Sequence, residues 1–189
     1  MQTILGLVDT GKLIKKSLKN SRRAQLQLYD KYCSGMFTVA LRYVKQTDIA
    51  EDVMQEAFIK AFEKLAEYDP QKNFGAWLKR ITINQAIDQQ RKEMPTTDFS
   101  EDVIQMHEAE YDEDWGVENK ISPKIIQGCM KQLTDKDAII LKLFLLEGYD
   151  HEEISQILDQ SNNASRTQLH RAKKRLKEQL KKRNDERFA

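Results

Sequence analysis

The sequence predicts an all-α protein in which two small helical domains are joined by an acidic flexible linker. Helix breakers are few, with 7 glycines and 3 prolines among 189 residues, and the many lysine, glutamate, glutamine, leucine and alanine residues favour helices. Apolar residues recur at helical spacing in both halves of the chain, and the segment between the halves lacks this spacing. The chain is long enough for two small domains.

Charge is distributed in three blocks, which agree with this division. Residues 1–94 contain 16 basic and 11 acidic residues, residues 95–123 contain 1 and 9, and residues 124–189 contain 14 and 10. The near-neutral total of +1 hides two basic blocks and one strongly acidic block. We therefore predict an N-terminal domain at 1–94, a linker at 95–123 that is disordered or partly helical when free, and a C-terminal domain at 124–189.

Several classes of protein are disfavoured by the sequence. It contains no apolar run as long as a membrane span and no secretory segment at its start, so we expect a cytoplasmic protein without a membrane partner. Cys33 and Cys129 are expected to be small buried residues, with a disulfide or metal pair as the weaker alternative. His107, His151 and His170 lack metal-ligand spacing. We find no phosphate loop or nucleophile constellation, and so expect no enzyme, cofactor or metal.

Four helices are expected in the first domain: one at about residues 12–19, a second after Ser21 that carries apolar residues from Ala24 to Tyr43, a third at about 48–65 and a fourth at about 74–92. Ser21 and Asn73 have side chains that can cap the second and fourth helices, and Asp48 is expected to open the third. The sequence Tyr68-Asp69-Pro70 should stop the third helix, because proline disfavours helical backbone in the residue before it.

Two of these helices have a polar face. In the third, Asp52, Gln55, Glu56 and Glu63 lie opposite an apolar face that includes Val53, Ala57 and Ala61. In the fourth, a polar stripe lies beside an apolar face formed by Phe74, Trp77, Leu78 and Ile81. The stripe consists of Arg80, Asn84, Asp88 and Arg91.

The second domain has the element order of a helix-turn-helix. After a short helical stretch from residue 125, Thr134 can cap a helix that Gly148 ends. A short helix at about 150–158, a break at 159–163 and a long final helix ending near Arg183 follow. Between Arg166 and Arg183 there are nine basic residues and one acid, Glu178. DNA phosphate is a natural partner for this charge, and a solvated basic helix end is the alternative.

Two sets of motifs occur in a fixed order. The first set is Leu28-Tyr29 with Tyr32, Ala50-Glu51-Asp52-Val53-Met54-Gln55-Glu56-Ala57-Phe58, and Phe74-Gly75-Ala76-Trp77-Leu78 with Arg80, Ile81, Asn84, Asp88 and Arg91. The second is Glu147-Gly148-Tyr149-Asp150-His151-Glu152-Glu153-Ile154, Leu158, and Leu169-His170-Arg171-Ala172-Lys173-Lys174-Arg175-Leu176. Together they resemble the two conserved halves of bacterial sigma factors of the extracytoplasmic-function group. The resemblance covers about residues 12–180.

The resemblance implies a factor that binds core RNA polymerase and directs promoter-specific transcription initiation. The helix at 48–65 would dock on the clamp helices of the largest polymerase subunit through Asp52, Gln55 and Glu56. A solvated face is the alternative for these residues. In this family the linker threads the active-site cleft and RNA exit channel, so the acidic segment would occupy a nucleic-acid path; an ordinary acidic spacer is the alternative.

By the same resemblance, the helix at 74–91 and the loop at 69–73 would melt and capture the minus-ten element. The residues implied are Asp69, Lys72, Asn73, Arg80, Asn84 and Arg91. A base that leaves the stack costs a few kcal/mol, which a pocket must repay. The amide of Asn84 can both donate to and accept from a base edge; capping or packing is its alternative role. Arg80 and Arg91 would contact phosphates, unless Asp88 holds either in an ion pair. Trp77 is assigned to the core.

The final helix would read duplex DNA at the minus-thirty-five element. The residues implied are Arg166, Thr167, His170, Arg171 and Lys174. An arginine pairing bidentately with guanine is worth about 1–3 kcal/mol of discrimination between bases.

The sequence departs from the family pattern around the turn. The family usually has glycine and an aliphatic residue at Asp159 and Gln160, Gly-Thr-Val at residues 163–165, and arginine at Gln168. Asp can replace glycine at a left-handed position, but polar residues at 160 and 165 should loosen the helix-turn-helix core and put ordinary minus-thirty-five recognition in question.

Other partners and two other functions stay open at this stage. The second domain could dock on the polymerase flap through apolar residues such as Ile139 and Leu143. An anti-sigma protein is expected at the level of the family. The alternatives are a stand-alone helix-turn-helix regulator that dimerises through its first domain, and a sigma-like factor brought to DNA by another targeting partner.

Overall fold

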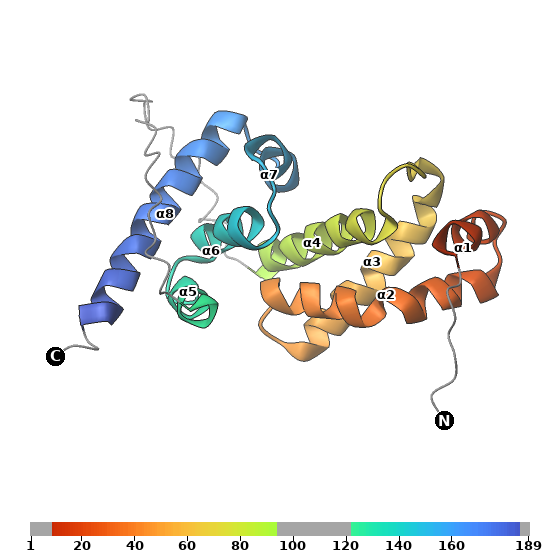
Figure 1. Cartoon of the computed structure of the whole chain (residues 1–189), viewed down its shortest axis with the longest axis horizontal. Helices are drawn as coiled ribbons and strands as arrows, with labels where there is room; N and C mark the ends of the chain where they lie inside the picture. Colours follow the sequence, from red (N-terminus) through yellow and green to blue (C-terminus); the bar gives the residue numbers. More distant parts are fainter. Residues whose placement is uncertain (1–8, 94–121, 186–189) are drawn as a thin grey trace. The chain divides into compact units, whose positions relative to one another are not determined.

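The computed structural model describes residues 9–93 and 122–185, and every regular element within these ranges is helical (Figure 1). The chain divides into two compact units, Met1–Ser100 and Glu101–Ala189, here called unit 1 and unit 2. This confirms the predicted all-α class with two small helical domains. Nearly all of the predicted linker at 95–123 lies outside the described residues, so its flexibility and the domain boundaries stay predictions.

Unit 1 is built from α1 (Thr10–Ser17), α2 (Arg22–Tyr43), α3 (Thr47–Glu63), the 3-10 turn η1 (Leu65–Glu67) and α4 (Phe74–Glu93). Helices α2, α3 and α4 pack against one another in pairs, and α1 packs on α2 (Figure 1).

The helix starts in unit 1 follow from local capping. The Ser21 hydroxyl accepts a hydrogen bond from the Ala24 amide at 3.4 Å, and the Asn73 side chain accepts one from the Ala76 amide at 3.0 Å. Both predicted caps are confirmed. Helix α1 begins two residues earlier than predicted, because Asp9 caps it. Helix α3 begins at Thr47, so Asp48 lies in its first turn, where a carboxylate interacts favourably with the helix dipole.

The core of unit 1 is a continuous apolar cluster drawn from all four α-helices and η1. Phe74 and Leu78 are buried in it, and Trp77 and Ile81 pack half-buried against it, as the sequence predicts. Its buried members are Leu13, Ile14, Ala24, Leu28, Met36, Met54, Phe58, Ala61, Leu65, Tyr68, Phe74 and Leu78.

Unit 2 consists of α5 (Pro123–Met130), α6 (Asp135–Leu141), the π-helical turn η3 (Lys142–Leu146), α7 (His151–Leu158) and α8 (Asn162–Asp185). Helices α5, α6 and α7 all pack on the long α8. The face that α8 turns toward them buries Leu169, Ala172 and Leu176. This arrangement is the predicted helix-turn-helix, with α7 and α8 as its two helices.

Two predicted signals in unit 2 are confirmed. The Thr134 hydroxyl accepts from the Asp137 amide at 3.3 Å, and Gly148 has φ +75°, a left-handed conformation that glycine adopts without strain. At α7, Asp150 and Glu153 form a reciprocal capping box with hydrogen bonds of 2.8 and 3.1 Å, which fixes the helix start expected near residue 150. All of these signals are local in sequence.

The turn between α7 and α8 is shorter than predicted. Asp159 has φ 51° and ψ 54°, so it occupies the left-handed position in place of glycine, as expected. Ser161 then accepts a hydrogen bond from the Ala164 amide at 3.1 Å. Because this hydroxyl caps α8, the helix begins at Asn162, and the predicted break at 159–163 is too long.

The two cysteines are both free and differ in burial. Cys129 is buried in unit 2, as predicted, whereas Cys33 is only half-buried at the edge of the unit 1 core, so that part of the prediction is wrong. Across residues 9–93 and 122–185, no set of three or more His, Cys, Asp or Glu residues is grouped to hold a metal ion. In the same ranges, no helix has both the length and the apolar character needed to cross a bilayer.

Candidate nucleic-acid interface

Helix α3 presents one polar face to solvent. Asp52, Gln55 and Glu56 are all exposed on it, while Val53 and Ala57 on the opposite side are buried. Residues three and four positions apart lie next to each other on a helix, so one partner can touch all three predicted polymerase-binding side chains. Their role stays a prediction.

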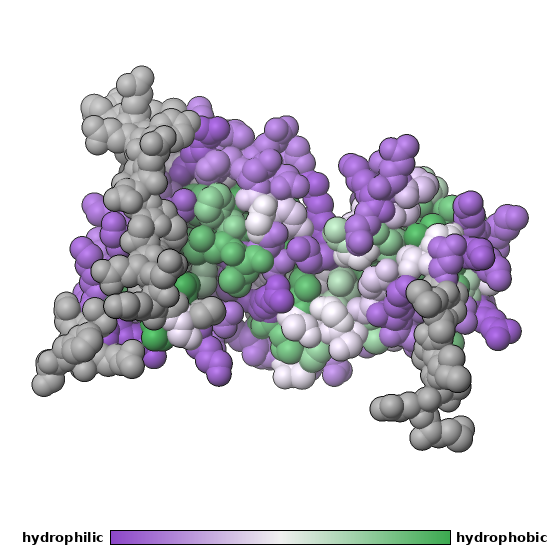
Figure 2. Space-filling view, viewed as in Figure 1, coloured by the Kyte–Doolittle hydropathy of each residue, from purple (hydrophilic) through white to green (hydrophobic). Residues whose placement is uncertain are grey.

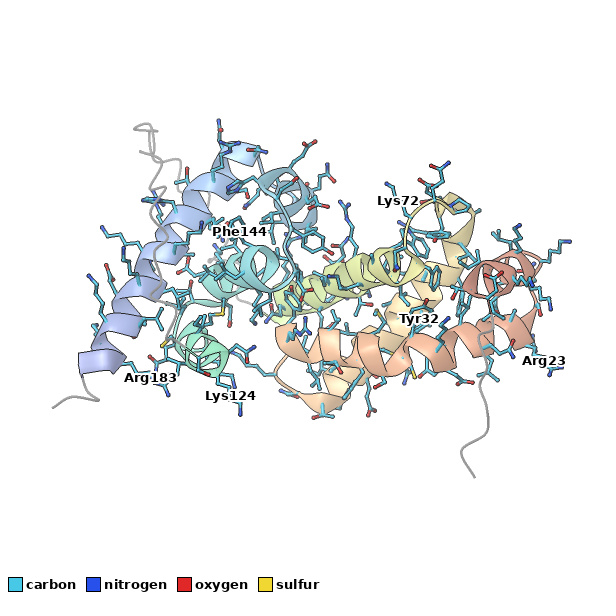
Figure 3. The ribbon with its side chains drawn as sticks, in the orientation of Figure 1. Arg23, Tyr32, Lys72, Lys124, Phe144 and Arg183 are labelled. Atoms are coloured by element: carbon cyan, nitrogen blue, oxygen red, sulfur yellow. The ribbon has the colours of Figure 1, made fainter. Side chains whose placement is uncertain are left out.

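The loop at residues 69–73 is held in one conformation by hydrogen bonds at each end. The Tyr68 hydroxyl donates to the Lys72 carbonyl, the Asp69 carboxylate accepts from the Gln71 amide at 2.9 Å, and Asn73 caps α4. The side chains of Asp69 and Lys72 remain exposed on this ordered backbone, and Figure 3 shows Lys72 on the loop that leads into α4. Burial, together with the nearby Asp69 and Tyr32, raises the pKa of Tyr68, so its hydroxyl keeps the proton that it donates.

Aromatic rings pack below this loop. Phe74 lies 5.4 Å from Tyr32, 5.4 Å from Tyr68 and 5.6 Å from Trp77, measured between ring centroids. A Cβ at Gly75 would lie 3.1 Å from the Tyr32 ring, so the start of α4 can approach α2 this closely because residue 75 is glycine. The aromatic cluster therefore holds the two ends of the loop, Tyr68 and Phe74, in place against α2.

The polar stripe of α4 is partly engaged within the unit. Asn84 is exposed, whereas Arg80 and Arg91 are half-buried. The Arg91 guanidinium lies 3.9 Å from the Asp88 carboxylate, which is the ion pair that the sequence left open as an alternative. The exposure of Asn84 does not fit its alternative role in packing.

Helix α8 carries four of its five predicted contact residues on the solvent side. Arg166, His170, Arg171 and Lys174 are exposed, and Thr167 is half-buried. The Arg166 side chain donates to the Asn162 side chain at 2.9 Å, one turn earlier, which orients it along the helix start.

Other basic residues of α8 stabilise unit 2 instead. The Arg175 guanidinium lies 2.6 Å from the buried Asp137 carboxylate of α6. The Lys173 ammonium lies 4.2 Å from the centre of the Phe144 ring. The Arg183 guanidinium lies against Gly128 of α5, so close that a Cβ at residue 128 would lie 2.7 Å from it. Figure 3 labels Phe144 and Arg183. The sequence grouped these cations with the nucleic-acid face. Their partners are distant in sequence, so helical periodicity alone could not find them.

The departures from the family pattern have different structural consequences. The Gln168 side chain donates to the Lys136 carbonyl at 3.2 Å, so residue 168 faces α6 and not the exposed side of α8. Ser165 is fully buried, and neither its hydroxyl nor the buried Gln160 amide nitrogen has a hydrogen-bond partner. These two unsatisfied groups agree with the predicted weakening of the helix-turn-helix core.

The residues expected to reach the polymerase flap are not available at the surface. Ile139 of α6 and Leu143 of η3 are both buried in unit 2, where α6 packs on α8. Leu146, at the end of the same segment, is exposed. The sequence identified these residues as apolar but could not tell that the packing of unit 2 buries them.

His151 lies at the first turn of α7, close to the cations of α8. Burial is the main cause that lowers its pKa, and Arg166 and Lys173 lower it further, against an opposing effect of Asp150. Its ring centroid is 6.0 Å from that of Phe144. The surroundings of His151 therefore favour its neutral imidazole.

Comparisons with known proteins agree with this geometry. Residues 28–96 match the family model for sigma-70 region 2, and residues 124–176 match that for sigma-70 region 4. The chain is 29% identical over 180 residues to the ECF RNA polymerase sigma factor SigW of Bacillus subtilis (strain 168), with 90% of this chain and 96% of that protein covered. It is 29% identical over 175 residues to the ECF RNA polymerase sigma-E factor of Escherichia coli (strain K12), with 85% and 88% covered.

Solved structures have the same fold. The sigma factor RpoE in complex with the anti-sigma factor NepR, from Bartonella quintana, aligns with a TM-score of 0.53 at 23% identity and covers 82% of this chain and 95% of its own. Both family models match in the predicted order, one in each unit, and the sequence relatives span nearly the whole chain. The chain therefore belongs to the extracytoplasmic-function (ECF) group of bacterial RNA polymerase sigma factors, which direct promoter-specific transcription.

Proposed function

We propose that this sigma factor binds core RNA polymerase through α3, captures the melted minus-ten element with the 69–73 loop and α4, and holds duplex DNA with α8. The observation that carries the proposal is the loop at 69–73. Its backbone is fixed by Tyr68 and Asn73, while Asp69 and Lys72 are exposed on it. A binding surface that is already ordered loses little conformational entropy when it captures a flipped base.

The minus-ten contact is supported by α4. Asn84 is the exposed amide of the polar stripe, and it can both donate to and accept from a base edge. Arg80 and Arg91 lie on the same stripe and are suited to phosphate contacts. Asn73 uses its side-chain oxygen to cap α4, so its amide nitrogen is the group left for DNA.

The duplex contact is supported by the exposed face of α8. Arg166, His170, Arg171 and Lys174 can reach a groove and its phosphates without disturbing the core of unit 2. As a sigma factor, the chain performs no chemistry of its own; polymerase supplies the catalysis.

An anti-sigma protein is a further expected partner. The RpoE structure from Bartonella quintana contains the anti-sigma factor NepR, and the structure of CnrH, which covers 91% of this chain at a TM-score of 0.52, contains the cytosolic domain of CnrY. We infer that this chain also binds an anti-sigma protein.

One observation favours a second candidate, in which a targeting partner helps unit 2 onto DNA. The unsatisfied Gln160 amide nitrogen lies in the turn before α8, and the unsatisfied Ser165 hydroxyl lies in the first turn of α8. If the isolated holoenzyme selects a defined minus-thirty-five sequence, this candidate fails.

The proposal is tested with purified chain, core polymerase and promoter DNA that carries a fluorescent base analogue in the minus-ten element. The chain should comigrate with polymerase, and fluorescence should rise as the element opens. Asn84→Ala should lower opening more than comigration, whereas Gln46→Ala, which removes an exposed amide before α3, should change neither. A wild-type chain that neither comigrates with polymerase nor opens the minus-ten element would refute the proposal. An equal decrease of comigration and opening in Asn84→Ala would give Asn84 a folding role.

A further inference from the structure

Unit 1 carries a basic surface that the proposed contacts do not use. Residues 10–29 contain no acidic residue and six basic ones, and all six side chains are exposed. We call this set the basic ridge; it consists of Lys12, Lys15, Lys16, Lys19, Arg22 and Arg23. Side chains around α1 are largely hydrophilic on the face seen in Figure 2, and Figure 3 shows Arg23 at the start of α2, pointing away from the bundle.

Lys12, Lys15 and Lys16 lie along one side of α1, because they are spaced three and four residues apart, and Lys19 lies in the turn directly after the helix. The opposite face, with Leu13, Ile14 and Ser17, is buried against the unit 1 core. Like charges four residues apart on a helix repel each other, so an anion bound between them would relieve a repulsion that the free protein carries.

The ridge stands on a rigid base. The Lys31 ammonium of α2 donates to the Thr10 hydroxyl at 2.7 Å, and the connecting turn is closed by Asn20 in a left-handed conformation with φ 59°. Arg22 and Arg23 then follow directly after this turn. The cations are therefore presented by two packed helices and the turn between them.

We propose that the basic ridge binds the phosphates of duplex DNA without regard to sequence, as a third DNA contact in addition to the minus-ten and minus-thirty-five surfaces. This proposal rests on the proposed function in one respect: it takes DNA to be the polyanion that the protein binds. Lysines are compact mobile charges that release counterions from DNA phosphates. Such contacts position a protein on the duplex but read no bases.

A membrane and an acidic protein fit the ridge less well. A helix that binds a bilayer surface needs a free apolar face, and the apolar face of α1 is buried. Leu18 and Leu26 are exposed near the ridge, at 48% and 59%, but they do not share a helix. Protein interfaces have an apolar centre depleted in lysine, which is the opposite of this composition.

The test compares two triple variants of the full chain with the same change in charge. Lys12→Gln, Lys16→Gln and Lys19→Gln together neutralise half of the ridge. Lys64→Gln, Lys124→Gln and Lys131→Gln remove three exposed lysines elsewhere. The affinity of the holoenzyme for a promoter duplex and for a non-promoter duplex of equal length is measured from low to high salt.

In a plot of log affinity against log salt, the slope for the ridge variant should be shallower than that of the wild type by about 0.9 for each phosphate that it no longer neutralises. This decrease should be the same on both duplexes, because phosphate contacts read no bases. The control variant should keep the wild-type slope. Replacing the same three ridge lysines by arginine should restore the slope, because arginine keeps the charge. Opening at low salt should survive in all variants.

Three results would overturn the proposal. An unchanged slope in the ridge variant would make the ridge a solvated face. Weaker comigration with polymerase at an unchanged slope would make it a polymerase contact, and loss of binding to anionic lipid vesicles at an unchanged slope would make it a membrane contact. If the wild type fails to open promoters, the same titration with the free chain on non-promoter duplex still tests the ridge separately from the proposed function.

Discussion

Ser165 is the residue where unit 2 departs most clearly from a well-packed helix-turn-helix. Its side chain is 0% exposed, and its hydroxyl has no partner. An unsatisfied buried hydroxyl costs about 1–3 kcal/mol, and alanine has the higher helix propensity. We expect Ser165→Ala to raise the free energy of unfolding of unit 2 by about 1 kcal/mol.

This gain can be measured by hydrogen exchange of peptides from α7 and α8. The matched control is Ser155→Ala in α7, because the Ser155 hydroxyl has a hydrogen-bond partner: it donates to the Glu152 carbonyl at 2.7 Å. Slower exchange in the Ser155 variant, or faster exchange in the Ser165 variant, would contradict this account.

His151 gives unit 2 a pH dependence whose sign can be worked out. Burial, Arg166 and Lys173 lower its pKa below the ordinary value of 6.5, so the unfolded chain takes up a proton at a higher pH than the folded unit does. The stability contributed by neutral His151 is present above pH 6.5 and is lost as the pH falls below it. His151→Gln should flatten the decline in stability between pH 7 and pH 5, as measured by thermal unfolding across this range.

One ion pair joins α6 and α8 in unit 2. Asp137 is 4% exposed, and Arg175 covers it with a guanidinium 2.6 Å away. Removing the arginine would leave a buried carboxylate unpaired, but Arg175 is itself 53% exposed, so water can replace part of that interaction. We expect Arg175→Gln to lower the free energy of unfolding of unit 2 by about 1–3 kcal/mol.

The neighbouring arginine on the exposed side of α8 is the matched control. Arg171→Gln should leave stability unchanged and reduce the salt dependence of duplex binding, and Arg175→Gln should do the opposite. Urea unfolding and a salt titration of each variant separate the two roles. If both variants changed stability and the salt dependence of duplex binding in the same way, α8 would have no separate structural and DNA-binding sides.

The sequence predicted these elements where the cause is local. Ser21, Asn73, Thr134 and Asp150 all stand at expected helix starts, because a capping side chain bonds to a backbone amide within three residues. Contacts between segments that are distant in the chain could not be predicted from the sequence. The bond from Arg175 joins residues 38 positions apart.

The candidate site was predicted to a similar degree. Helical spacing identified the exposed face of α3, because it reports which residues share a side of a helix, whereas the contact residues of α8 were implied by the resemblance to the sigma family. Helical spacing could not report which side another helix covers, so Ile139 and Leu143 were assigned to a docking surface although both are buried. The ordered loop at 69–73 depends on the Tyr68 hydroxyl and the aromatic rings around it, which no single motif indicates.

At the scale of the whole molecule, the near-neutral total of +1 conceals basic surfaces in both units. The unit 1 ridge and the exposed face of α8 belong to different compact units, so neither should alter the local geometry of the other. Phosphate contacts made by such separate sites contribute nearly independently to affinity, because they share no partner residues. The salt dependence of DNA binding should therefore be a sum over the two units.

This additivity leads to a prediction for a double variant in unit 2. Arg166→Ala with Arg171→Ala should weaken duplex binding and lower the log–log salt slope by about one for each phosphate that α8 no longer neutralises. Comigration with polymerase should persist, because the proposed α3 contact lies in unit 1. Adding the three ridge substitutions should lower the slope further by the amount that they cause alone. A combined decrease smaller than the sum would mean that both units compete for the same stretch of DNA, and an unchanged slope in the double variant would place both arginines in solvent in the bound complex.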